Sequence, residues 1–468
     1  MSSSVEHVIQ KAHAAQQRYN SFTQAQVDEV VTAAAWAIVN PENNQLLAEM
    51  AVADTGLGRV EDKIIKNRRK TMGLLRDLKG AKSVGVIAEY PEKGIVEIAR
   101  PVGVVGAVVP STNPAATPAN KTLNALKGRN AIILAPSPKG DRTCAKLVEL
   151  IHQELARVGA PLDLVQKLPS PINKADTEEL MKRVDLIVAT GSQNNVRNAY
   201  SSGTPAVGVG AGNVVSIVDE TADLNSAAEK IITSKSFDNA TSCSSENNLV
   251  IVEECYDRMI EALENRGAVL LSAIQKQRLQ AAMWPDGKLS PLIMAKDARE
   301  IIDIANIEEV DDDLKKTVKV LLVEEDQCGV EAPFSGEKLS PVLTVYKAKN
   351  FLDAQERANA IMDFQGKGHS ISIHTLNEQR PLQMGLEMPV CRVIVNQVHC
   401  YATGGNFNNG LPFSLSMGCG SWGENSISEN LNFRHYLNTT RIVHTIPNNE
   451  PSEEEIFGDY LQKIATQL

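Results

Sequence analysis

Aromatic residues are scarce in this 468-residue sequence, where Phe, Trp and Tyr together make up 4%. Long apolar runs are also missing, because no stretch approaches the roughly 18 apolar residues of a membrane-spanning helix. The start of the chain, Met1 to His7, has neither the basic residues nor the apolar segment of a secretory signal. We therefore expect a protein that is neither exported nor embedded in a membrane.

Clusters of basic residues and paired cysteine motifs are absent too. The formal net charge is −10, and lysines and arginines are dispersed among acidic residues, which argues against a nucleic-acid partner. The seven cysteines show no CxxC or Cys/His spacing, so we predict no metal site. Reduced thiols in the cytoplasm are the expected state.

Apolar residues, in contrast, reach 43%, enough for two or three large cores in a chain of this length. The first 80 residues predict helices, one of which starts with a capping box at 23–26. The segment from Asp62 to Leu78 is helical and strongly basic. Such a face is usually solvated, and we assign it no function.

Two strand-like runs near 84–89 and 95–100 flank a turn and predict a β-hairpin, which is a candidate oligomerisation arm. From Val102 onward, apolar strands alternate with helices, as in parallel β-α-β units with helices on both faces. The expected strands are 104–109, 130–135 and 184–189, and the expected helices lie near 116–128, 141–158, 175–182 and 192–201.

Ligands of such a sheet bind beyond the carboxyl ends of its strands. The residues at those ends are small, polar or basic, as a nucleotide site requires: Pro110, Ser111, Thr112, Asn113, Ser137, Lys139, Thr190, Gly191 and Ser192. The glycine cluster 208–213 does not fit GxGxxG and favours simple turn chemistry, although Gly210 is kept as a candidate cofactor contact.

Alternation resumes after the glycine cluster and predicts a second α/β domain. Its expected strands are 215–218, 249–252, 318–323, 342–346, 370–374 and 392–396. The segment from Pro447 looks like an acidic tail. We expect a nucleotide-binding domain over 1–213, a catalytic domain over 214–424, and a C-terminal segment over 425–468 that returns to the first domain or to an oligomer interface.

Cys243 lies on a polar loop between a predicted helix and a β-branched run, where a scaffold commonly presents a reactive group. Beside a nucleotide-type sheet, this thiol could attack an aldehyde, lose a hydride to nicotinamide and keep the acyl group as a thioester. The Cys243 N–H and the Asn113 amide could bind the oxyanion. Alternatives are an incidental cysteine, a cysteine hydrolase and a non-catalytic binding protein.

Six ordered motifs resemble the CoA-acylating branch of the aldehyde dehydrogenase superfamily over nearly the whole chain. They are 112–114, 190–192, 208–213, 239–247, 337–342 and 418–423. Within that branch, 111–120, 236–247 and 399–410 most resemble the members that act on sulfoacetaldehyde; acetaldehyde and succinate semialdehyde are alternative substrates. The resemblance implies two α/β domains with a hairpin arm and a dimer or tetramer.

Position by position, the resemblance makes Cys243 the nucleophile, Asn113 the oxyanion donor and Glu337 the residue that holds the nicotinamide ribose. The turn 190–192 matches the segment near the pyrophosphate. Hydrolytic members of the superfamily carry a water-activating glutamate where this sequence has Gly208. A site without that base should leave the acyl group for another thiol, and coenzyme A is the implied acceptor.

NADP is the favoured cofactor, with NAD possible. The segment after the second strand carries Ser137, Lys139 and Arg142 and only one acidic residue, Asp141. Arg142 could equally be a solvated turn residue. His369 matches a histidine that lies near the nucleophile in the acylating branch, and it is either a proton acceptor or structural. An anionic aldehyde needs cations or neutral donors, for which the candidates are Gln397, His399, Tyr401 and Asn408.

Overall fold

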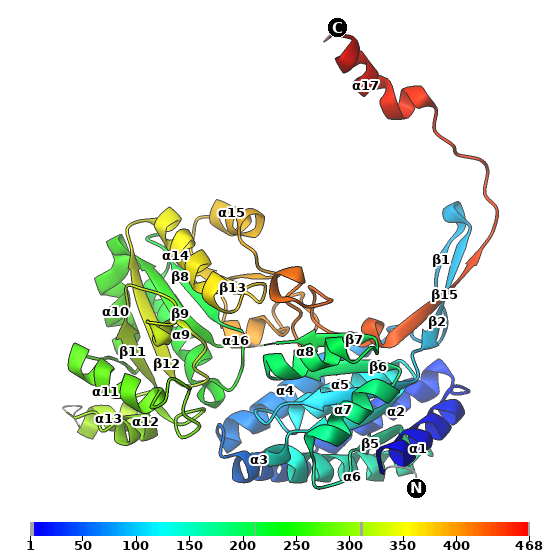
Figure 1. Cartoon of the computed structure of the whole chain (residues 1–468), viewed down its shortest axis with the longest axis horizontal. Coiled ribbons are helices and arrows are strands. Elements are labelled where there is room, and N and C mark those ends of the chain that lie inside the picture. Colours follow the sequence, from blue (N-terminus) through cyan, green and yellow to red (C-terminus); the bar gives the residue numbers. More distant parts are fainter. Residues whose placement is uncertain (1–3, 211, 309–311, 467–468) are drawn as a thin grey trace.

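The computed structural model describes residues 4–210, 212–308 and 312–466, which form two parallel α/β units and a projecting arm (Figure 1). The first unit holds a five-stranded sheet in the order β5-β4-β3-β6-β7. Its strands are β3 (Val104–Val109), β4 (Ala131–Pro136), β5 (Val165–Lys167), β6 (Leu186–Thr190) and β7 (Ala206–Val209). Every pairing in this sheet is parallel, as the alternating pattern predicts.

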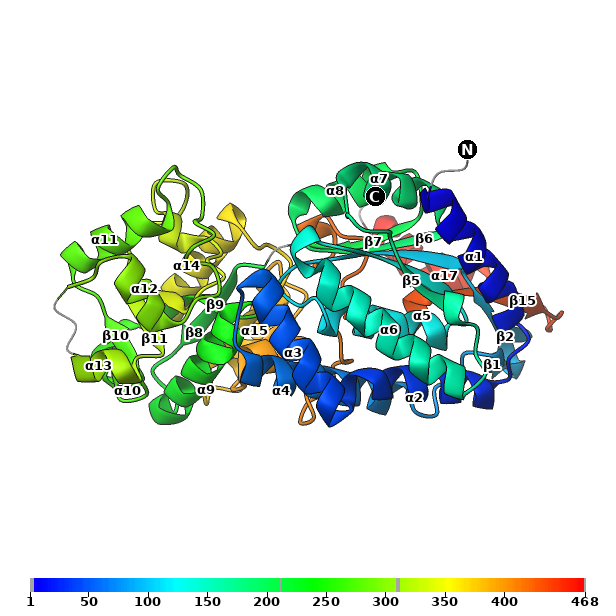
Figure 2. The ribbon, with the colours of Figure 1, turned by 90° about the horizontal axis from the view of Figure 1, so that it is seen from below.

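Helices cover both faces of the first sheet (Figures 1 and 2). They are α1 (Ser4–Tyr19), α2 (Gln24–Val39), α3 (Pro41–Thr55), α4 (Val60–Leu78), α5 (Ala116–Lys127), α6 (Asp141–Arg157), α7 (Lys174–Arg183) and α8 (Gln193–Ser201). The predicted capping box is confirmed, since Thr23 and Gln26 satisfy each other's backbone N–H groups. Buried aliphatic side chains from helices and strands form one continuous core.

The second unit contains a seven-stranded parallel sheet in the order β10-β11-β12-β9-β8-β13-β14. Its strands are β8 (Val214–Val218), β9 (Glu246–Val252), β10 (Ala268–Leu270), β11 (Val320–Glu324), β12 (Val342–Ala348), β13 (Ile371–His374) and β14 (Val393–Val395). Its helices are α9 (Leu224–Ser236), α10 (Tyr256–Glu264), α11 (Ala273–Met283), α12 (Ala298–Ile304), α13 (Asp312–Thr317), α14 (Phe351–Phe364), α15 (Gln379–Glu387) and α16 (His399–Ala402). The expected α/β fold with two parallel sheets is confirmed.

The arm consists of β1 (Gly85–Tyr90), β2 (Ile95–Pro101) and β15 (Leu437–Val443), paired antiparallel with β2 in the middle. Beyond β15 the chain runs away from the body to α17 (Glu453–Ala465) (Figure 1). The expected acidic tail projects from the body and contains a helix that begins at the capping box of Ser452 and Glu455.

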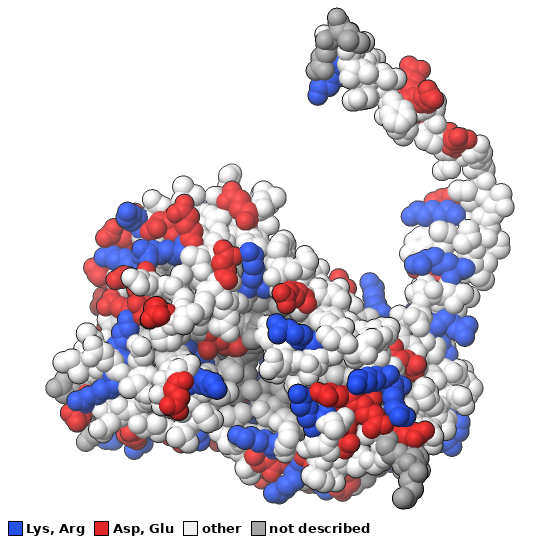
Figure 3. Space-filling model, in the orientation of Figure 1, with Lys and Arg blue, Asp and Glu red and all other residues white. Residues whose placement is uncertain are grey.

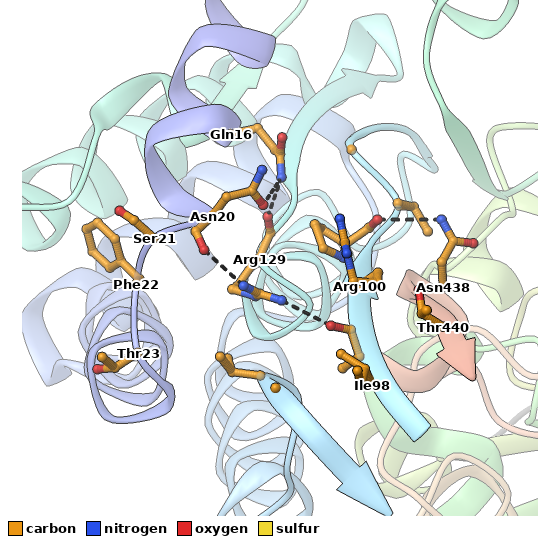
Figure 4. A pocket seen from close by; sticks show the side chains of 16 residues that line it. Gln16, Asn20, Ser21, Phe22, Thr23, Ile98, Arg100, Arg129, Asn438 and Thr440 are labelled. Atoms are coloured by element: carbon orange, nitrogen blue, oxygen red, sulfur yellow. Dashed lines mark hydrogen bonds between the residues drawn. The ribbon is translucent and has the colours of Figure 1, made fainter. Parts of the chain in front are cut away.

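A cavity of about 980 Å³ lies at the base of the arm, between the α1–α2 turn and strands β2 and β15 (Figure 4). Arg129 crosses it and donates to the backbone oxygens of Asn20 and Ala99, at 3.0 and 3.2 Å. These bonds tie the arm to the first unit. On the face drawn in Figure 3, acidic and basic residues are interspersed, as the composition suggests. No helix in the described residues is long and apolar enough to cross a membrane.

Candidate active site

The loop that carries Cys243 turns sharply where α9 ends. Asp238, Asn239 and Ala240 all have positive φ angles of 50°, 50° and 57°, a region that non-glycine residues seldom adopt. Such a conformation persists only where the surroundings hold it. Cys243 follows this turn and precedes β9, so the strained turn sets the position of the thiol.

Asp238 holds the turn to α4 through buried charges. Its carboxylate accepts from the Lys63 ammonium at 3.2 Å and from the Lys66 ammonium, and the three side chains are almost inaccessible to solvent. The Arg59 N–H donates to the other oxygen at 2.9 Å. Burial alone would raise the pKa of Asp238, but Lys66 and Lys63 outweigh it and hold the pKa below its ordinary value. The charged form of Asp238 therefore fixes the loop.

The assignment of 62–78 as a solvated basic face is wrong for part of this helix. Lys63, Lys66 and Lys70 are buried, whereas Arg68 on the opposite side is exposed. The signal was present in the sequence, since spacings of three and four residues put these lysines on one helical face. What the sequence did not show was the buried partner, Asp238, more than 170 residues away.

Lys66 also reaches the predicted oxyanion donor. Its ammonium donates to the Asn113 side-chain oxygen at 2.9 Å and to the Thr241 hydroxyl at 2.9 Å. Asn113 and the loop of Cys243 thus lie on either side of one ammonium group. An ammonium only donates, so the amide oxygen must face Lys66 and the Asn113 NH₂ group points elsewhere.

The Cys243 thiol is half-buried and not disulfide-bonded. Burial, and next the carboxylate of Glu337, raise the pKa of the thiol to about 12. Burial likewise raises the pKa of Glu337 to about 8. The thiol is therefore protonated near neutral pH, and its attack on a carbonyl requires that the proton leaves.

Gly212 packs against the backbone of Cys243. A Cβ at Gly212 would come within 2.5 Å of the Cys243 carbonyl oxygen and 3.1 Å of the His369 ring, so no larger residue fits. The Gly212 N–H also bonds to the Glu337 carboxylate. Gly212 is therefore more than a turn residue. Cys243, His369 and Glu337 all contact this one segment of backbone.

His369 is buried and belongs to a chain of hydrogen bonds. Its Nδ1 lies 2.8 Å from the Ser370 hydroxyl, which lies 3.0 Å from Nε2 of His399. Burial, with the Arg392 charge, lowers the pKa of His369 to about 3. The imidazole is neutral, and its Nε2 has no hydrogen-bond partner among the described residues.

A second cavity, of about 440 Å³, opens at the carboxyl ends of β3, β4 and β6. Five of the predicted cofactor residues line it: Pro110, Ser111, Ser137, Gly191 and Ser192. Small and hydroxyl-bearing side chains at this edge of a parallel sheet fit a dinucleotide. Ser192 also caps α8 by accepting from the Asn195 N–H.

The remaining predicted cofactor residues lie outside the lining of this cavity. The Thr112 backbone oxygen accepts from Lys63 at 3.1 Å, and the Thr190 hydroxyl contacts Ser416 at 2.7 Å. Lys139 is exposed, and Gly210 packs against the Gln193 side chain. Arg142 turns to Asp54, at 3.4 Å. Asp141 forms an ion pair with Lys167 at 2.7 Å.

The loop after β14 meets α4 beside the thiol loop. Tyr401 packs its ring edge-on against Phe237, with centroids 4.9 Å apart, and Arg69 lies over the Tyr401 ring at 4.5 Å. The Gln397 side chain accepts from Asn409 at 3.0 Å, Asn408 is exposed and His399 is fully buried. Of the four predicted substrate residues, Tyr401 has ring contacts to both α4 and the thiol loop.

Gly208 lies in β7, where the side chains of Val196 and Tyr200 fill the space that a Cβ would need. The Tyr200 hydroxyl donates to the Gly208 oxygen and accepts from its N–H. No side chain projects from this position toward Cys243. The carboxylate that raises the pKa of the Cys243 thiol is instead Glu337.

Comparisons with known proteins agree with this geometry. The profile of the aldehyde dehydrogenase family matches residues 1–321. Among curated proteins, the sulfoacetaldehyde dehydrogenase (acylating) of Cupriavidus necator is 58% identical over 98% of this chain and 92% of its own.

Solved structures are similar as well. An acetylating aldehyde dehydrogenase from Geobacillus thermoglucosidasius superposes with a TM-score of 0.91 at 36% identity, over 96% of this chain and 98% of that one. A propionaldehyde dehydrogenase from Rhodopseudomonas palustris, solved with bound CoA and an acylated cysteine, superposes with a TM-score of 0.84 at 26% identity, over 94% of this chain and 97% of its own.

Proposed function

Because this chain belongs to the aldehyde dehydrogenase family, we propose that it oxidises sulfoacetaldehyde to sulfoacetyl-CoA, with Cys243 as the nucleophile. The Cys243 sulfur forms a bond to the carbonyl carbon, and its proton leaves to Glu337, to His369 or to water. The Cys243 N–H and the Asn113 NH₂ group stabilise the resulting oxyanion. When bound, NADP would accept the hydride that leaves the former carbonyl carbon. The acyl group then stays on Cys243 as a thioester.

The thiol of coenzyme A then attacks the thioester and displaces the Cys243 thiolate. The observation that carries this proposal is Gly208, which has no side chain to activate water against the thioester. The CoA-bound, acylated propionaldehyde dehydrogenase supports the same order of events.

NADP is proposed over NAD for two reasons. The Asp141 carboxylate forms an ion pair with Lys167, which offsets its repulsion of a 2′-phosphate, and Ser137 lines the cavity where that phosphate would lie. Lys139 is exposed two residues after Ser137. The free thiols support a reducing compartment, and we propose the cytoplasm. The antiparallel arm and the exposed apolar residues of α17 support a homo-oligomer.

The test is NADPH formation, followed at 340 nm, with sulfoacetaldehyde, NADP and CoA, each omitted in turn. We expect sustained turnover only with all three, and a single burst equal to the enzyme concentration without CoA. Cys243→Ser should abolish both phases. Turnover at full rate without CoA contradicts acyl transfer to CoA. If kcat/KM for acetaldehyde or succinate semialdehyde equals that for sulfoacetaldehyde, the assignment of a sulfonated substrate is contradicted.

A further inference from the structure

The buried cations of α4 continue beyond those that hold Asp238. Arg69 and Lys70 follow Lys66 by one helical turn and lie beside Tyr401 and Gly404. Neither forms an ion pair with any carboxylate in the described parts of the chain. With Lys63 and Lys66, this face of α4 presents four cations, against the two carboxylates Asp62 and Asp238.

Arg69 lies close to two aromatic rings. Its guanidinium carbon is 4.5 Å from the Tyr401 ring centroid and 5.5 Å from that of Phe407, and Nη2 donates to the Asn406 side-chain oxygen. Its Nε is buried and has no hydrogen-bond partner within the residues described. The rings fix the plane of the fork and leave N–H groups at its edge unsatisfied.

Lys70 is buried beside Arg69. Its ammonium donates to the Gly404 carbonyl oxygen at 2.8 Å, which uses one of its three N–H groups. Burial, followed by repulsion from Arg69, lowers the pKa of Lys70 to about 7. Two desolvated cations side by side are unfavourable unless an anion offsets their charge.

This pair lies close to the loop that carries Cys243. Lys66, one turn earlier, contacts both Asn113 and Thr241, and the Lys70 charge lies close enough to interact with Cys243. The Tyr401 ring joins Arg69 to Phe237, the first residue of the turn that leads to Cys243. A ligand attacked by Cys243 therefore has these cations within reach of a short substituent.

We propose that Arg69, with Lys70 beside it, is the subsite that binds the sulfonate of the aldehyde and selects sulfonated over neutral substrates. This inference rests on the proposed function. The sulfonate sulfur of sulfoacetaldehyde is two bonds from the carbonyl carbon, so its binding group must line the wall beside Cys243. The guanidinium fork matches two sulfonate oxygens, and an ammonium can meet the third.

Binding and turnover of Arg69→Gln test the subsite. The binding probe is 2-hydroxyethanesulfonate, which has the sulfonate but no carbonyl for Cys243 to attack, measured by titration calorimetry. Arg69→Gln should raise both the Kd of this probe and the KM for sulfoacetaldehyde by about 10–100-fold. Arg69→Lys should give Kd and KM values between those of the wild type and Arg69→Gln. Arg68→Gln is the matched control, because its side chain is exposed, and it should change neither value.

The phosphates of CoA have similar anion chemistry, so the KM for CoA is measured alongside. An increase confined to the KM for CoA, or an unchanged Kd for the probe in Arg69→Gln, overturns the sulfonate subsite. Unaltered melting temperatures show that Arg69→Gln is folded. Calorimetry does not need turnover, so a wild-type enzyme that binds the probe but does not oxidise sulfoacetaldehyde disproves the proposed function separately.

Discussion

The Lys66 ammonium donates to the Asn113 side-chain oxygen at 2.9 Å, and this contact determines which way the Asn113 amide faces. With its oxygen held by a cation, the amide can present only its NH₂ group to a ligand. The same ammonium bonds to Thr241, two residues before Cys243. The position of the proposed oxyanion donor is therefore coupled to the position of the thiol loop.

Asn113→Ala should lower kcat by about 10²–10³, the usual cost of losing an oxyanion donor. Lys66→Met should also lower kcat, because the released amide can rotate and the positive charge is lost. Single-turnover formation of NADPH measures both effects. The double variant should lose little more than Asn113→Ala alone, since both act through one amide. Lys79→Met, at the exposed residue that follows the C-terminal end of the same helix, is the control, and additive losses contradict the coupling.

Asp238→Asn should reduce the free energy of unfolding by about 3–5 kcal/mol, because it leaves Lys63 and Lys66 buried without their carboxylate. Denaturant unfolding measures the change. Since the pKa of Asp238 is lowered in the folded state, its contribution is present above the unfolded pKa of about 3.9 and is lost as the pH falls further.

The difference between wild type and Asp238→Asn should therefore be large at pH 7 and shrink below about pH 4. Asp363→Asn is the control, because its ion pair with Lys367 is exposed and such pairs contribute about 0–1 kcal/mol. A difference that grows as the pH falls contradicts a charged Asp238 in the folded protein.

Glu337→Gln should speed alkylation of Cys243 by iodoacetamide at alkaline pH. The Glu337 carboxylate disfavours the thiolate, and its own pKa is raised to about 8, so the acceleration should develop above about pH 8. Mass spectrometry of the Cys243 peptide measures the rate, with exposed Cys328 as internal reference. Glu331→Gln, at an exposed position, should match wild type. Slower alkylation of Glu337→Gln at every pH instead identifies Glu337 as the base that accepts the thiol proton.

Charged substitutions on α17 should weaken assembly. Ile456, Phe457, Tyr460 and Leu461 are apolar and exposed on a helix that projects from the body, which marks an interaction surface (Figure 1). The double variant Phe457→Asp, Leu461→Asp should lower the molecular mass measured by light scattering during size-exclusion chromatography. Val330→Asp is the control, since Val330 is 81% exposed and outside the arm and α17. An unchanged mass contradicts a role of α17 in assembly.

The sequence predicted the long strands well because their apolar runs are buried on both sides. It missed β5, β7 and β10, which contain three or four residues each, and the longer β15, and all four lie at the edges of their sheets. An edge strand pairs on one side only and needs a shorter apolar run, so hydrophobic pattern alone does not separate it from a loop. The acidic start of α17 concealed a helix for a related reason, because no buried face marks it.

For the site, the sequence indicated Cys243 and Asn113 but not what holds them. Lys63 and Lys66 are buried only because Asp238 meets them from a distant part of the chain, and a sequence without spatial contacts shows no such partner. The chain from His369 through Ser370 to His399 is likewise a product of the fold. Local residue chemistry suggested Cys243 and Asn113 as candidates, whereas the long-range ion pairs and hydrogen bonds around them could not be read from the sequence.

The arm has a consequence for the timing of folding during synthesis. Its middle strand, β2, pairs with β15, so that Pro101 meets Leu437 and Ile95 meets Val443. A two-stranded hairpin is marginally stable by itself, and the third strand reaches the ribosome exit only after both α/β units have been made. The arm is therefore completed only after both α/β units have been translated, so its three-stranded sheet is among the last parts of the fold to form.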